Sequence, residues 1–215
     1  MADNRSGKGV SNALDIIGGS ARLVRAAAGT AKPTEVSDII NAATSPYALA
    51  AGWTDFGATD GGITTTRSLE KNELEVDQVL GTIEEEVVDT SMTLETNLAE
   101  LSLENFQIAW GLDGTIGTNN APAAGFNNET TLGIGTNNCL QDYMIALIQD
   151  KRADCSSTDR YVRIYVYWRA QWSGADSGLT FTKGEKSILP LTFNLLVDTT
   201  ETDDRNFGII LNQVV

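Results

Sequence analysis

The sequence contains no histidine. Histidine is the side chain whose unperturbed pKa lies nearest neutral pH, and it is the commonest general base and a frequent neutral metal ligand in proteins. Catalytic triads and zinc sites that depend on imidazole are therefore excluded.

Cysteine and long hydrophobic runs are also scarce. Two cysteines, Cys139 and Cys155, lack a CxxC spacing and are too few for a disulfide scaffold. We therefore expect free thiols in a protein that folds in a reducing compartment. No run approaches the roughly 18 apolar residues of a membrane-spanning helix, and the N-terminal segment has no sustained apolar stretch. We expect a soluble protein that makes no membrane contact and is not exported by a standard signal.

Positive charge is the third shortage, because 15 lysines and arginines stand against 29 acids, for a net charge of -14. Specific nucleic-acid binding depends on cationic contacts with phosphates and is disfavoured. The acids gather in residues 68–95, SLEKNELEVDQVLGTIEEEVVDTSMTLE, where nine carboxylates accompany one lysine. This stretch has three interpretations: a catalytic carboxylate cluster, a cation site, or the solvated wall of a large hairpin.

Length and composition fit one β-rich domain. A chain of 215 residues with 41% hydrophobic content can bury a proper core. We expect residues 1–19 to be an N-terminal arm, either docking on another surface or frayed, and residues 20–215 to be a single domain. The segment SARLVRAAAG predicts a short strand that ends at Gly29. Residues 60–62, Asp-Gly-Gly, predict a turn.

Alternating apolar and polar residues predict a long acidic hairpin over residues 68–97. In its second limb Met92 and Leu94 alternate with Thr93 and Glu95, and the first limb alternates in the same way. We expect one apolar face towards the core, one acidic face outwards, and a connection over residues 78–87. Acids spaced by two along a strand point to solvent in parallel and do not converge in a pocket, which argues against catalysis.

The segment LSLENFQIAWG predicts a helix. Ser102 can cap it, an apolar stripe of Leu103, Phe106 and Trp110 follows, and Gly111 can end it. Residues 111–138, rich in glycine and asparagine, predict a loop that is too long for a routine connection and is therefore functional or in contact with a partner.

The C-terminal half predicts further strands. Residues 139–150 fit a helix or a buried strand, and we favour the strand because YVRIYVYWRAQW at 161–172 is a clear partner. In that partner Trp168 and Trp172 share one parity. Pro190 marks an edge or a bulge within the strand of KSILPLTFNLLVD, and RNFGIILNQVV predicts a closing strand.

Motifs for chemistry are weak. The stretches DGTIGTNN and ATDGG lack the ligand pattern of an EF-hand loop, and no glycine motif has the strand-loop-helix setting of a nucleotide site. Ser102 has no histidine to activate it and is better explained as a cap. Arg163 and Arg169 lie between tyrosines, and we expect them to pair with carboxylates of the same chain or of a neighbouring subunit. We predict no enzymatic activity and no metal or other cofactor.

The order of these segments resembles the tail tube proteins, also called major tail proteins, of tailed bacteriophages. Residues 52–111 carry an aromatic-Asp-aromatic-Gly strand in WTDFG, a glycine turn, a strand rich in Glu and Val, a strand of the VTLE type in MTLE, and a helix of the SLENF type. RYVRIYVYWRAQ, FTKGEKSILPLTFNLLVD and NFGII are similar to the second half of the family. The resemblance covers roughly residues 20–212, and the length of the 111–138 loop departs from it.

The resemblance implies a mainly β fold, a sandwich or barrel flanked by one helix. It also implies six subunits in a ring, rings stacked into a hollow tail tube, and inner strands joined into a continuous β-barrel between subunits. DNA would pass through the tube without specific binding, and the protein would be a virion component made and assembled in the host cytoplasm. Implied partners are further copies of the chain, the tape-measure, tail-tip or baseplate and terminator proteins, and a sheath if the tail contracts.

Within that frame three sets of residues become candidates. Candidates for the lumen are the acids of outward parity: Glu73, Glu75, Asp77, Asp89 and Glu95. Candidates for ring stacking are residues of the predicted connection: Gln78, Val79, Leu80, Gly81, Thr82, Ile83, Glu84, Glu85 and Glu86. Candidates for the subunit interface are Arg163, Tyr165, Tyr167 and Arg169.

A second interpretation is a monomeric carbohydrate-binding or receptor-binding β-sandwich. It depends on exposed aromatic residues that would form a binding strip on one face of the sheet: Tyr161, Tyr165, Tyr167 and Trp172.

Overall fold

The computed structural model describes residues 21–41, 47–75, 82–119, 129–136, 139–152, 160–174, 178–184 and 186–214. Most of them form one antiparallel sheet of eight strands in the order β4-β1-β9-β10-β11-β6-β5, with β12 paired to β10. Its strands are β1 (Arg22–Ala27), β4 (Trp53–Asp55), β5 (Thr59–Glu75), β6 (Thr82–Leu98), β9 (Asp142–Arg152), β10 (Arg160–Trp172), β11 (Leu189–Leu196) and β12 (Gly208–Val214). The predicted mainly β fold with a flanking helix is confirmed, and in the described part of the chain the sheet does not close into a barrel.

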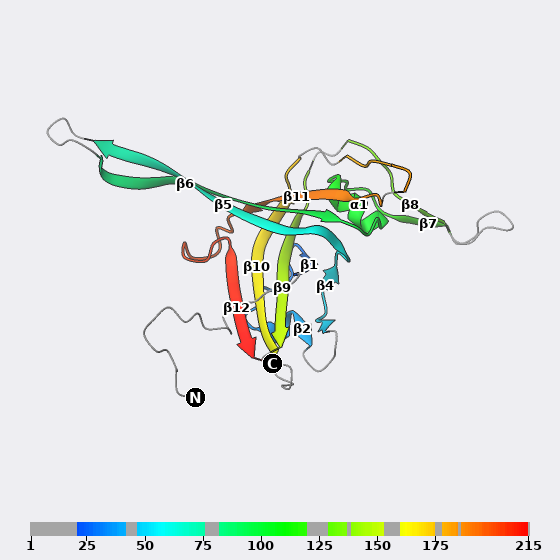
Figure 1. The fold of residues 1–215 in the computed structure, drawn as a ribbon, viewed down its shortest axis with the longest axis horizontal. Coiled ribbons are helices and arrows are strands. Elements are labelled where there is room, and N and C mark those ends of the chain that lie inside the picture. Colours follow the sequence, from blue (N-terminus) through cyan, green and yellow to red (C-terminus); the bar gives the residue numbers. More distant parts are fainter. Residues whose placement is uncertain are drawn as a thin grey trace.

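Strand β10 divides the sheet into two parts. One edge pairs with β9, while the other pairs with β12 along Tyr161–Tyr167 and with β11 along Arg169–Trp172. Where the partner changes, β10 contains one extra residue, because Tyr167 lies opposite Ile145 and Ala170 opposite Tyr143. The strands β5, β6 and β11 therefore run across the upper end of β9, β10 and β12 (Figure 1).

This bulge corrects the predicted alternation of β10. An extra residue inverts the faces of all later side chains. Trp172 therefore lies on the side of Ala170 and the helix, opposite to Trp168, although the two tryptophans share a parity in the sequence.

Two hydrophobic cores cover the two faces of the central strands. The inner core lies between β1, β9 and β10 on one side and β5, β6, β11 and the helix on the other; it includes Leu23, Ile145, Leu94, Phe193 and Ile108. The outer core lies on the opposite face, beneath the segment that holds the short helical turn η1 (Val36–Asp38) and strands β2 (Ile40–Asn41) and β3 (Ala48–Leu49). Both faces of the upper half of the middle strands are thus covered, as the bulk on both parities of residues 161–172 predicts, whereas in the lower half Tyr161, Arg163 and Tyr165 are only half-buried.

The predicted helix is α1 (Leu103–Ala109). The hydroxyl of Ser102 accepts a hydrogen bond from the amide of Asn105 at 3.1 Å, and Gly111 follows with a φ of +59°. The buried side differs from the predicted stripe, because Asn105, Ile108 and Ala109 are buried while Phe106 and Trp110 are half-buried. Asn105 is tolerated there because its amide donates to the carbonyls of Phe56 and Glu100, both at 2.9 Å.

Several other predictions have clear outcomes. The strand near residue 20 is β1, the ambiguous segment at 139–150 is β9, and the closing strand is β12. The predicted turn at residues 60–62 is wrong, since Gly61 and Gly62 have positive φ in a bulge within β5. Pro190 pairs with β6 on one side. On the other side the described pairing of β11 with β10 begins only at Phe193, so Pro190 lies at a local edge of the sheet.

The long loop at 111–138 contains structure that the sequence did not predict. Strands β7 (Gly117–Asn119) and β8 (Glu129–Thr131) pair antiparallel as a separate two-stranded sheet. It extends beyond α1, on the opposite side of the molecule from the β5–β6 hairpin (Figure 1). Cys139, just after this segment, is an exposed free thiol, and Cys155 lies outside the described residues.

Candidate assembly surface

The β5–β6 hairpin projects from the body of the molecule (Figure 1). Its base is a full part of the sheet, because β6 pairs with β11 over Met92–Leu98. Beyond Met92 the described residues of β5 and β6 pair only with each other, as a two-stranded ribbon. We call residues 68–75 and 82–91 the ribbon. Its apolar side chains are exposed, with Leu74 at 47% and Val88 at 63% of full exposure.

The ladder assigns each ribbon side chain to one of two faces. Glu70 lies opposite Asp89 and Lys71 opposite Val87, so Val88 is an extra residue on β6. Directly opposed residues share a face, which gives two surfaces. The core-side face continues the face that carries Met92 and Leu94, and consists of Leu69, Lys71, Glu73, Glu85, Val87 and Thr90. The acidic face consists of Ser68, Glu70, Asn72, Leu74, Glu84, Glu86, Asp89, Ser91 and, on the body, Glu95.

The two faces divide the predicted lumen residues. Asp89 and Glu95 lie on the acidic face, whereas Glu73 lies on the core-side face. The expectation that these acids share one face is therefore wrong. Strand β5 alternates without an inserted residue from Ile63 to Leu74, which places Glu73 with Leu69 and leaves the apolar Leu74 exposed on the acidic face. Glu75 is the last residue of β5 and its side chain is not described, and Asp77 lies outside the described residues.

The predicted apolar and acidic faces need a second correction. The apolar residues of the ribbon do not reach the core of their own chain, since Leu69, Leu74, Ile83 and Val87 are exposed. Only Met92, Leu94 and Leu98, nearer the base, pack in the inner core. The ribbon is therefore an extension with two solvated faces, one of mixed composition and one with four acids.

Half of the predicted connection belongs to a strand. Strand β6 begins at Thr82, so the ribbon includes part of the proposed stacking set: Thr82, Ile83, Glu84, Glu85 and Glu86. The remaining members lie outside the described residues: Gln78, Val79, Leu80 and Gly81.

The core-side face carries a small ionic group. The ammonium of Lys71 donates to the carboxylate of Glu85 at 2.5 Å, and Glu73 lies directly opposite Glu85. The hydrogen bond to Glu85 and the charges of Glu85 and Glu73 raise the pKa of Lys71. Two acids with one lysine leave an excess of negative charge on this face.

A second surface lies below the hairpin, on the lower half of β9, β10 and β12. On the side of the inner core these strands present the exposed Asn212, opposite Arg163, and six further residues that we call the open face: Gln149, Lys151, Tyr161, Arg163, Tyr165 and Ile210. Ile210 is 64% exposed and the other five are half-buried. The open face has aromatic, apolar and basic side chains, and none of its described members is an acid.

A groove of about 700 Å³ joins this surface to the hairpin. Arg67 and Met92 of the hairpin line it together with Tyr165 and Ile210, and the turn at residues 203–208 contributes Asp203, Asp204 and Arg205. The base of the hairpin and the open face of the sheet therefore border the same groove, which none of the described ribbon residues lines.

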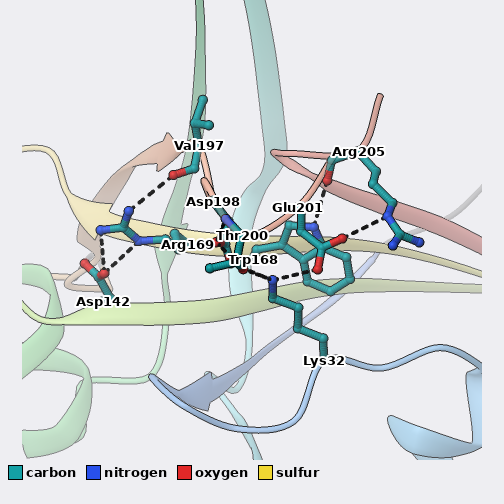
Figure 2. Close-up of polar contacts among 9 residues, drawn as sticks. All are labelled: Lys32, Asp142, Trp168, Arg169, Val197, Asp198, Thr200, Glu201 and Arg205. Carbon is teal, nitrogen blue, oxygen red and sulfur yellow. Dashed lines mark hydrogen bonds and ion pairs between the residues drawn. The ribbon is translucent and has the colours of Figure 1, made fainter. Parts of the chain in front are cut away.

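The predicted interface residues have different surroundings. Arg163 and Tyr165 belong to the open face. Tyr167 is buried beneath the hairpin, where burial raises its pKa and Thr65 is its hydrogen-bond partner. Arg169 binds within its own chain, donating to Asp142 at 2.8–2.9 Å and to the carbonyl of Val197 at 3.2 Å (Figure 2).

A polar cluster that sequence reasoning missed fixes the turn at one side of the groove. The ammonium of Lys32 binds Asp198 at 2.7 Å, Glu201 at 2.8 Å and the hydroxyl of Thr200 at 3.0 Å (Figure 2). Glu201 also accepts from Arg205 at 2.8 Å. Hydrogen bonds from Lys32 and Thr200 hold the pKa of Asp198 far below its usual range. These residues lie up to 173 positions apart in the sequence, so no local pattern indicates the cluster.

The aromatic strip of the second interpretation does not form. The bulge brings Trp172 to the side of Tyr161, Tyr165 and Tyr167, but Tyr167 is buried, the ring of Trp172 lies against Gly111 and its indole nitrogen is buried. Tyr161, Tyr165 and Trp172 are half-buried, so the four side chains do not form one exposed strip.

The described part of the chain contains no group of three or more acids or cysteines placed to hold a metal ion. None of its helices is long and apolar enough to cross a membrane.

Comparison with known proteins agrees with the resemblance. No curated protein matches the chain. The model of one protein family, described as phage tail tube protein, matches residues 9–207 of the 215. A mainly β chain with a projecting acidic ribbon fits a structural role in a phage tail. This chain belongs to the phage tail tube protein family.

Proposed function

We propose that the chain is a structural subunit that assembles into hexameric rings, and that the rings stack into the hollow tube through which phage DNA leaves the particle. The observation that carries the proposal is the ribbon, which exposes Leu74 and Val88 beyond the reach of its own core. An isolated two-stranded hairpin is marginal in water. A ribbon of this length is therefore expected to be stabilised by other copies of the chain.

The strand order supports closure between copies. Strand β5 is the last in the sheet and its outer edge has no partner among the described residues. Unpaired edges promote aggregation unless they are covered. In a ring, β5 of each copy would pair with the inner layer of the next, and the inner strands would form one continuous barrel. Head-to-tail contacts of this kind close into rings.

The acidic face is the surface that we assign to the lumen. Glu70, Glu84, Glu86, Asp89 and Glu95 carry like charge on one side of the hairpin. Fixed negative charge repels phosphates, so DNA would pass without binding. Glu75 and Asp77 remain candidates for the same surface, and residues 78–86 remain the candidate contact with the next ring. Tape-measure, tail-tip or baseplate and terminator proteins, and a sheath in a contractile tail, would be the other partners. Assembly would take place in the host cytoplasm.

Negative-stain imaging of the concentrated protein tests the assembly. We expect tubes whose end-on views average with six-fold symmetry. Discrete globules at all concentrations would contradict the proposal.

The lumen assignment has its own test in phage particles. The double variant Asp89→Asn, Glu95→Gln should still form tubes but should release DNA more slowly, since less negative charge faces the genome. The matched control is Asp113→Asn, Glu129→Gln, which removes the same charge from the region of β7 and β8. Equal release rates for the two variants would contradict the assignment.

A further inference from the structure

We infer that the core-side face of the ribbon covers the open face of a second copy, so that each β-sandwich is completed by its neighbour. The inference rests on the proposed function for the existence of an assembly. It goes further by naming which two surfaces of the chain meet.

The packing within one chain provides the pattern. Near the base of the hairpin the same face of β5 and β6 already packs on β10, where Thr65 bonds the hydroxyl of Tyr167 and Leu94 lies in the inner core with it. Further along the hairpin this layer continues with Leu69, Val87 and Lys71, but the β9, β10 and β12 strands of the same chain do not follow it. The layer formed by β5 and β6, the upper layer, therefore extends beyond the strands β9, β10 and β12 on which it packs.

The strands β9, β10 and β12 form the lower layer, which in turn extends beyond the hairpin that covers it. Strands β9, β10 and β12 continue below the hairpin, and on this side their lower half presents the open face with Ile210 at 64% exposure. Its opposite side is covered by the outer core. A sheet face with Tyr161, Tyr165 and Ile210 is suited to packing against a second layer. Among the described residues, no second layer covers the ribbon end of the upper layer or the lower half of the lower layer.

The charges of the two faces indicate that a second copy of the chain covers each of them. The core-side face carries Glu73 and Glu85 opposite each other with Lys71 beside them, which leaves it negative. The open face carries Arg163 and Lys151 and no described acid. Like charges directly opposite on a ladder are destabilising, and a guanidinium from another copy would offset them. Asp203 and Asp204 line the groove together with Tyr165 and Ile210. These two acids therefore border the open face but do not belong to it.

The two surfaces cannot meet within one chain. The ribbon projects away from the lower ends of β9, β10 and β12 (Figure 1). Contact between different patches on two copies is heterologous, and it repeats because every copy offers both patches. The geometry therefore describes a contact that passes from copy to copy, as a ring requires.

Engineered disulfides test the pairing of faces. In a background of Cys139→Ser and Cys155→Ser, the variant Leu69→Cys, Arg163→Cys should form a ladder of covalent multimers on mild oxidation. The control Ser68→Cys, Arg163→Cys places the thiol one residue away, on the acidic face, and should remain largely monomeric on a denaturing gel. Equal cross-linking of both variants, or of neither while tubes are present, would overturn the inference.

Charge reversal provides a second test. Glu73→Arg and Arg163→Glu should each raise the protein concentration for half-maximal assembly by about tenfold, the equivalent of about 1.4 kcal/mol, while the circular dichroism of the monomer stays unchanged. Combining both substitutions in one chain should restore assembly. Lys183→Glu, the same change on an exposed lysine of the β10–β11 connection, should have no effect.

The outcomes separate this inference from the proposed function. If the unmodified chain forms no tubes, the proposed function fails. If it forms tubes and the two single reversals assemble like Lys183→Glu, the tube stands and the pairing of these two faces is wrong. Assembly lost in both single variants and not recovered in the double variant would also reject the direct contact.

Discussion

Gly208 at the start of β12 is a residue that packing requires to be glycine. A Cβ at this position would lie 1.9 Å from the carbonyl oxygen of Val166 and 3.1 Å from the Cα of Tyr167. Both atoms belong to the backbone of β10, which is held on both edges and cannot move aside. The glycine therefore allows β12 to approach the central strand beside the bulge.

We predict that Gly208→Ala lowers the free energy of unfolding by more than about 2 kcal/mol, towards the upper end of the range for overpacked sites. Urea denaturation of the unassembled protein measures it. The control is Gly178→Ala, where a Cβ would meet nothing within 4 Å and φ is not positive, so the change should stay within about 0.5 kcal/mol. Similar midpoints for the two variants would contradict the prediction.

At the scale of elements, the Lys32 cluster joins the segment after β1 to the connection between β11 and β12. Asp198 and Glu201 are mostly covered, with side chains 14% exposed, and both bind Lys32. The ring of Trp168 lies 5.4 Å from the ammonium, and its indole nitrogen donates to the carbonyl of Arg205. The turn that lines the groove is thereby fixed to the central sheet.

The pKa of Asp198 makes this attachment sensitive to acid. Because the folded pKa lies below the usual value of 3.8, the stabilisation is complete above the unfolded pKa and is lost as pH falls through it towards the folded pKa. We predict that Asp198→Asn lowers the Tm at pH 7 by a few degrees, since about 1 kcal/mol corresponds to about 2–4 °C in a domain of this size. The difference in Tm from the unmodified protein should shrink between pH 5 and about pH 2.

Differential scanning calorimetry across this pH range measures the effect. The control is Asp203→Asn, an exposed acid on the same connection, whose Tm should follow that of the unmodified protein. A difference for Asp198→Asn that is constant with pH would show that the carboxylate is not the source of the stabilisation.

Elements with regular patterns were predictable from the sequence, and those shaped by one inserted residue were not. Alternation located β6, β10 and β11, and the cap at Ser102 located α1. The extra residues at Val88 and near Trp168 exchange faces, and nothing in a period-two pattern reveals them. The extra residue near Trp168 is the reason that Trp168 and Trp172, which share a parity in the sequence, lie on opposite faces. Glu73 was expected on the face of Asp89 because the alternation of the first limb predicts Leu74 on the core side, whereas Leu74 is exposed on the acidic face. The Lys32 cluster depends on contacts between distant segments, which a local pattern cannot contain.

At the scale of the whole molecule, the chain is a well-packed body with an extension that lacks its own core. The body has an inner and an outer core on the two faces of β9 and β10. Each strand of the ribbon pairs only with the other strand of the ribbon, and the apolar residues of the ribbon are exposed. Stability is therefore unevenly distributed: in the unassembled protein, opening of the ribbon should require much less free energy than opening of the sheet.

Hydrogen–deuterium exchange should detect this difference and its removal by assembly. In unassembled protein we predict fast exchange for amides of residues 84–90 and slow exchange for residues 92–98 of the same strand, which β5 and β11 flank on both sides. In tubes, residues 84–90 should slow by about tenfold or more, because opening would also break contacts with a neighbour. Residues 144–148, buried in both states, are the internal reference. If residues 84–90 exchange equally fast in both states, neighbours do not support the ribbon, and the exposed Val87 and Val88 require another explanation than assembly.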